Sequence, residues 1–63
     1  MESLINNFIN GNLKDARSEA ESFSLSQIRT ALVDDYGYGF EKASLTAYYL
    51  KTGEGFQDAC DAE

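Results

Sequence analysis

The residues best placed to do chemistry lie in the segment DDYGYGF, residues 34–40. It holds two carboxylates, three aromatic rings and two glycines, which suggest a metal site, a stacking surface or a phosphate loop. A calcium loop needs oxygen ligands at alternating positions and a closing glutamate about twelve residues along, whereas Asp34 and Asp35 are adjacent. GYGFEK falls short of a phosphate-binding loop and carries acids on both sides. We therefore interpret 34–40 as the connector between two helices.

Elsewhere the sequence contains no group of residues typical of a catalytic or metal site. There is no histidine, and histidine is the commonest general acid–base. Cys60 is the only cysteine, so the nitrogen and sulfur ligands of a structural zinc site are also missing. We expect no enzymatic activity, no cofactor and no bound metal.

Charge and length narrow the classes of partner. Eleven acidic and five basic residues give a net charge of −6 over 63 residues, which disfavours direct contact with nucleic acid or with anionic membranes. A basic protein partner would suit this charge. No apolar run approaches the roughly 18 residues of a membrane span, and a lone cysteine fits a reducing compartment. We expect one cytoplasmic domain, residues 1–63.

The clearest helix signal begins at Ser24. Ser24 and Gln27 have the spacing of a capping box, and Gly37 stands where a helix often ends in a left-handed residue. Between them, apolar residues recur at helical spacing: Leu25, Ile28, Leu32 and Tyr36. The pattern predicts a helix over 25–36.

Similar patterns predict the other helices. A helix is expected from Phe40 to the residue before Gly53. Its inner face would carry Phe40, Ala43, Ala47 and Leu50. Asn12 is a plausible cap for a helix whose inner face is Leu13, Ala16, Ala20 and Phe23. An N-terminal helix would use Leu4, Ile5, Phe8 and Ile9 and end near Gly11. The tail adds a last turn with Phe56, Ala59 and Cys60 facing inward. The expected fold is all-α, a compact bundle of four to five short helices.

The helix after Phe40 has more apolar residues than one face can bury. Leu45 and Tyr49 point away from its inner stripe, and Tyr48 lies between the two faces. Either another helix covers Leu45 and Tyr49, which makes this helix central, or they form an exposed patch for a partner or for a second copy in a homodimer.

Two nucleic-acid-related alternatives stay open. The acidic residues, Asp34 and Asp35 among them, would form one negative face that mimics DNA, unless Lys14, Arg17 and Arg29 interrupt it through helical ion pairs. Alternatively, the two helices flanking 37–39 have the outline of a helix-turn-helix. In that arrangement the second helix would carry lysines toward a groove.

The short length, the acidic balance and the run DYGYGFEKASLTAYYLKTGEGFQDACDAE resemble the small uncharacterised proteins encoded by phages and plasmids. The resemblance implies expression inside a bacterial cell and interference with a host protein. We expect a protein-interaction module whose partner, as yet unidentified, contacts Leu45, Tyr48, Tyr49, Asp34 and Asp35.

Overall fold

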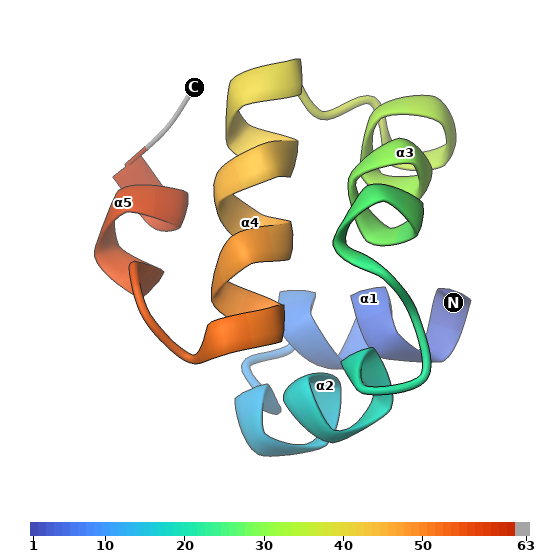
Figure 1. Cartoon of the computed structure of the whole chain (residues 1–63), viewed down its shortest axis with the longest axis vertical. Helices are drawn as coiled ribbons and strands as arrows, with labels where there is room; N and C mark the ends of the chain where they lie inside the picture. The colour runs from blue at the N-terminus through green and yellow to red at the C-terminus, as the bar shows by residue number, and fades with distance from the viewer. Residues whose placement is uncertain (62–63) are drawn as a thin grey trace.

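The computed structural model describes residues 1–61, and these form five α-helices without a β-strand (Figure 1). The helices are α1 (Glu2–Ile9), α2 (Leu13–Ala20), α3 (Leu25–Tyr36), α4 (Phe40–Thr52) and α5 (Phe56–Asp61). The predicted all-α bundle of short helices is thereby confirmed.

Helix α4 is the centre of the bundle. It packs against α3, α5 and α2, while α1 packs mainly against α2. Figure 1 shows α3 and α5 on opposite sides of α4, with α1 and α2 across its C-terminal end. The core gathers apolar side chains from α1 to α4: Leu4, Ile5, Ala16, Ala20, Ile28, Leu32, Ala43, Ala47, Tyr49 and Leu50.

Both ends of α3 form as the sequence predicts. The backbone N–H of Gln27 donates to Ser24 Oγ at 3.1 Å, and the N–H of Ser24 donates to Gln27 Oε1 at 2.8 Å. At the other end Gly37 has φ +73°, and the N–H of Tyr38 reaches back to the carbonyl of Leu32 at 3.0 Å. The N–H of Gly37 donates to the same carbonyl, so the chain closes on Leu32 around a left-handed residue, a conformation that glycine adopts readily.

The inward faces were predicted well in the middle of the helices and wrongly at several ends. Phe40 is 67% exposed and Ile9 is 56% exposed, although both were expected to face inward. Each occupies a terminal position of its helix, where fewer neighbouring elements are available to cover a side chain. Phe23 follows α2 rather than ending it, but it still packs against the core. In α5 Ala59 is buried, whereas Cys60 is exposed and Phe56 is 39% exposed.

Candidate functional site

The three apolar candidates on α4 do not form one exposed patch. Tyr49 is only 6% exposed. Its ring lies 5.1 Å from that of Phe56 in α5 and 6.3 Å from that of Phe8 in α1, measured between centroids. Leu45 is half-buried, while Tyr48 is 44% exposed. Helix α5 therefore covers Tyr49, and of this group Tyr48 alone offers a largely accessible surface.

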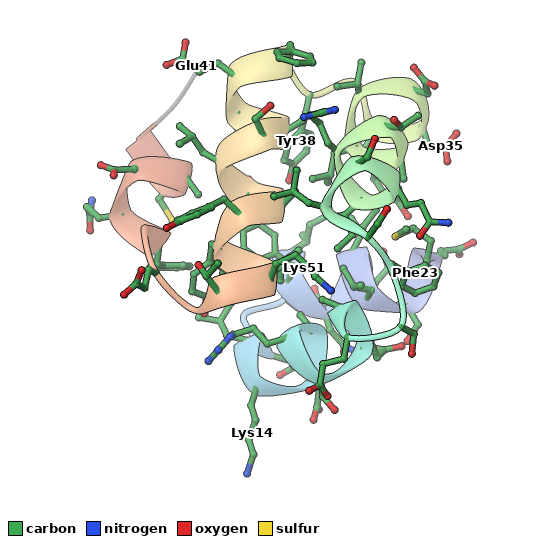
Figure 2. The ribbon with its side chains drawn as sticks, in the orientation of Figure 1. Lys14, Phe23, Asp35, Tyr38, Glu41 and Lys51 are labelled. Carbon is green, nitrogen blue, oxygen red and sulfur yellow. The ribbon has the colours of Figure 1, made fainter. Side chains whose placement is uncertain are left out.

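Asp34 and Asp35 remain accessible, at the C-terminal end of α3. In Figure 2 the side chain of Asp35 projects outward from α3, away from α4. Both residues line a shallow groove of about 380 Å³. The whole lining comes from α3: Ser26, Gln27, Thr30, Ala31, Asp34 and Asp35.

The helical repeat explains this groove. Ser26, Thr30 and Asp34 are four residues apart and form one ridge, and Gln27, Ala31 and Asp35 form the next, because side chains at i and i+4 lie above one another. Ser26, Thr30 and Ala31 are small side chains that leave the space between the rows open, and the two carboxylates line its C-terminal end. A partner helix would fit this groove, because the ridges of one helix pack into the grooves of another.

The basic residues do not neutralise these carboxylates. Among the residues that the structure describes, no lysine or arginine forms an ion pair with an acid, contrary to the helical pairs expected for Lys14, Arg17 and Arg29. Instead, three cations lie over aromatic rings. Arg29 lies 5.1 Å from the centroid of Phe40, Lys42 4.8 Å from that of Tyr38, and Arg17 6.0 Å from that of Tyr49.

Burial also affects Tyr38, which lies in the connector beneath Lys42. Desolvation raises the pKa of the Tyr38 phenol above its ordinary value of 10.0, because a partly buried site disfavours the charged phenolate. Its ring packs against the core. The segment 34–40 thus combines a partly buried ring in the connection between α3 and α4 with two exposed carboxylates at the end of α3.

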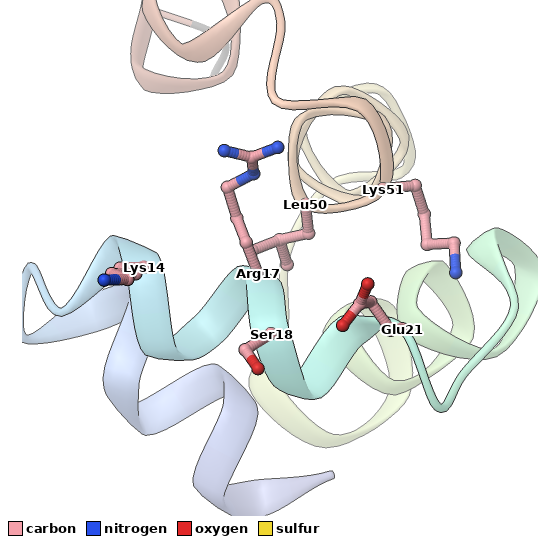
Figure 3. A pocket seen from close by; sticks show the side chains of 6 residues that line it. All are labelled: Lys14, Arg17, Ser18, Glu21, Leu50 and Lys51. Atoms are coloured by element: carbon pink, nitrogen blue, oxygen red, sulfur yellow. The ribbon is translucent and has the colours of Figure 1, made fainter.

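A second hollow, of about 230 Å³, lies between α2 and α4 (Figure 3). Its lining is Lys14, Arg17, Ser18, Glu21, Leu50 and Lys51. Three of the five basic residues of the chain thus contribute to its lining, although Figure 3 shows their charged ends directed to different sides. The sequence gives little sign of this pocket, because Lys51 is more than 30 positions from Arg17 and only the packing of α4 on α2 brings them together.

The geometry bears on both nucleic-acid alternatives. The two lysines of α4 are engaged: Lys42 lies over Tyr38, and Lys51 Nζ donates to the carbonyl oxygens of Ala20 and Phe23. As a recognition helix, α4 would therefore offer phosphates only the one remaining donor of Lys51 and an ammonium already held over a ring. Figure 2 also shows Asp35 and Glu41 pointing to opposite sides of the molecule, which separates two acids of the proposed negative face.

Comparison with known protein families, with curated proteins and with solved structures found no match. Among the described residues, no helix has the length and apolar character needed to cross a bilayer. Within the same residues, no three potential metal ligands of the histidine, cysteine or carboxylate type lie together.

Proposed function

We propose that this chain is a protein-interaction module that binds a basic, helical segment of a protein partner along the outer face of α3. The observation that supports it is the groove of about 380 Å³ lined by Asp34 and Asp35, two exposed carboxylates that form no ion pair among the described residues. Tyr48 lies on α4, outside the groove lining, and is not required for this contact.

Electrostatics would contribute mainly to association rate and selectivity. Exposed ion pairs typically contribute about 0.2–1 kcal/mol each, so two carboxylates alone provide modest affinity. The net charge of −6 adds a field that attracts a basic partner and repels acidic ones. Packing of the partner between the ridges of α3 would supply the rest, as in other helix-in-groove contacts.

The cellular setting is part of the same proposal. On the resemblance to small phage and plasmid proteins, the proposed setting is the bacterial cytoplasm and the proposed target a host protein. The single cysteine agrees with a reducing compartment. DNA mimicry has less support, because Asp35 and Glu41 point in opposite directions. The helix-turn-helix alternative has less support because α4 is the central helix of the bundle.

A charge-reversal pair tests the proposal. The Asp34→Lys/Asp35→Lys variant should lose binding to a lysine-rich amphipathic helical peptide. The matched Glu54→Lys/Asp58→Lys variant changes net charge equally on exposed residues near and in α5 and should retain it. We expect at least a tenfold loss for the first variant, since two pairs are lost and replaced by repulsion. Lysine in the last turn of α3 complements the helix dipole, so unfolding should not explain the loss.

The readout is the set of backbone amide shifts in the nitrogen-15 NMR spectrum. Binding at the groove should move the amides of 26–35 and weaken as salt is raised. A pull-down from bacterial lysate should retain a partner that Asp34→Lys/Asp35→Lys loses and Glu54→Lys/Asp58→Lys keeps. Equal binding by both variants would mean that only net charge matters, and the α3 surface would then be rejected.

A further inference from the structure

We propose that the hollow between α2 and α4 is a binding site for a dianionic oxyanion of the phosphate-monoester class. This site is separate from the α3 groove and does not depend on the function proposed for it. It is lined by the most concentrated group of cations in an otherwise acidic chain: Lys14, Arg17 and Lys51.

Arg17 is the anchor of the site. Its guanidinium lies 6.0 Å from the centroid of the Tyr49 ring, and Gly53 makes room for it. A Cβ at Gly53 would overlap Arg17 Nη2, so the absence of a side chain there allows the guanidinium to lie against the end of α4. No hydrogen bond or ion pair joins Arg17 to any other described residue. A positioned guanidinium with five uncommitted N–H donors is suited to bidentate binding of an oxyanion.

Lys51 borders the pocket from the other helix. Figure 3 shows its side chain and that of Arg17 on opposite sides of Leu50. The Nζ of Lys51 donates two hydrogen bonds to backbone carbonyls, with Nζ to oxygen distances of 3.0 and 2.7 Å. These bonds restrain the side chain and leave one N–H donor. Lys14 lies three residues before Arg17 and therefore near it on the surface of α2.

The net charge of the pocket lining indicates which class of anion would bind. Three cations and the carboxylate of Glu21 line the pocket, so two positive charges are left uncompensated. A phosphate monoester carries about −1.5 to −2 charges at pH 7, which matches this excess better than a single carboxylate does. Glu21 is exposed, so water as well as the pocket solvates its carboxylate. The negative field of the rest of the chain is screened beyond about 8 Å at physiological ionic strength.

Titration of the nitrogen-15-labelled chain tests this site, with inorganic phosphate as the probe and sodium chloride or acetate at equal ionic strength as controls. Phosphate should produce saturable shifts at the Arg17 side-chain Nε–H and at the Gly53 amide, and the controls should not. Arg17→Gln should weaken binding at least tenfold, whereas Arg29→Gln, with the same change in net charge on another helix, should not. Glu21→Gln should strengthen binding severalfold.

Lys14→Gln is a second variant that separates loss of binding from loss of folding. Among the described residues, the Lys14 ammonium makes no contact that stabilises the fold. The variant should weaken phosphate binding severalfold while leaving the unfolding midpoint unchanged. N-acetyl-phosphoserine amide distinguishes the source of the anion. Tighter binding than inorganic phosphate would indicate a phosphorylated protein chain, and equal binding a small free phosphate. Equal responses to phosphate and acetate, or no change in Arg17→Gln, would overturn the proposal.

Discussion

The ammonium of Lys51 donates a hydrogen bond of 2.7 Å to the carbonyl oxygen of Phe23, 28 residues earlier in the chain (Figure 2). A second bond, of 3.0 Å, reaches the carbonyl of Ala20 at the end of α2. Carbonyls at a helix end lack intrahelical partners, and a cation there also interacts well with the helix dipole. Lys51 thereby ties the α2–α3 connection to the central helix.

Replacing Lys51 by methionine should destabilise the fold by about 1–3 kcal/mol, because hydrogen bonds to a charged donor are stronger than neutral ones. The Phe23 carbonyl would lose its partner among the described residues, and the Ala20 carbonyl would keep only the N–H of Phe23. Urea unfolding followed by circular dichroism measures this. Lys14→Met removes the same type of charge without a described contact and should change stability by less than about 0.5 kcal/mol. Equal effects in the two variants would show that the Lys51 bonds contribute nothing beyond charge.

Removing the capping hydroxyl of Ser24 should cost about 1 kcal/mol in the Ser24→Ala variant, because the N–H of Gln27 loses its acceptor. Ser26 provides the matched control: it is exposed in the first turn of the same helix, where alanine is the better helix former. Ser26→Ala should be neutral or slightly stabilising in the same urea experiment. A Ser24→Ala variant as stable as wild type would contradict a contribution from the capping box.

Thr46 is fully buried in α4, and its hydroxyl has no hydrogen-bond partner. Thr46→Val exchanges that hydroxyl for a methyl group of similar shape and should stabilise the protein by about 1 kcal/mol, since the cost of burying an unsatisfied polar group disappears. Thr30→Val makes the same change on the exposed face of α3 and should not stabilise. Loss of stability in Thr46→Val would indicate that the hydroxyl is satisfied in solution.

Phe56 covers Tyr49 from α5, with the ring centroids 5.1 Å apart. Phe56→Ala should therefore destabilise the protein by about 1–2 kcal/mol and speed amide exchange in α5, since aromatic pairs contribute beyond their buried area. Phe40→Ala is the control. Phe40 is 67% exposed and contacts the Arg29 guanidinium, so its removal should cost less than about 1 kcal/mol. A larger loss in Phe40→Ala would reverse this ranking.

The raised pKa of Tyr38 predicts a pH dependence. Folding stabilises the neutral phenol, so this contribution is fully present below pH 10.0, the ordinary pKa, and is lost as pH rises through the higher folded value. Stability should therefore fall above about pH 10, and Tyr38→Phe should fall less steeply over the same range. Urea midpoints measured at several alkaline pH values test this. Parallel curves for the two proteins would exclude Tyr38 as the source.

Residues close together in the sequence determined much of this structure. The Ser24–Gln27 capping box and the left-handed Gly37 specify both ends of α3, because each interaction joins residues only a few positions apart. The helical repeat likewise places Asp34 away from Ile28 and Leu32. Asp35 lies seven residues after Ile28, on the same side of the helix, and is exposed in the last turn of α3. These features depend on local hydrogen bonds and backbone angles, so the sequence alone predicts them.

Tertiary packing decided the rest. The sequence left Tyr49 with two alternatives, and the docking of α5 placed it in the core. Phe40 fits an inward stripe, yet its ring is 67% exposed, with the Arg29 guanidinium of α3 over it. The meeting of Lys51 with α2, and the pocket it shares with Arg17, likewise depend on how α4 crosses α2. A helical pattern identifies which side chains share a face, but burial depends on which other helices reach that face, and this is set by the packing of the whole chain.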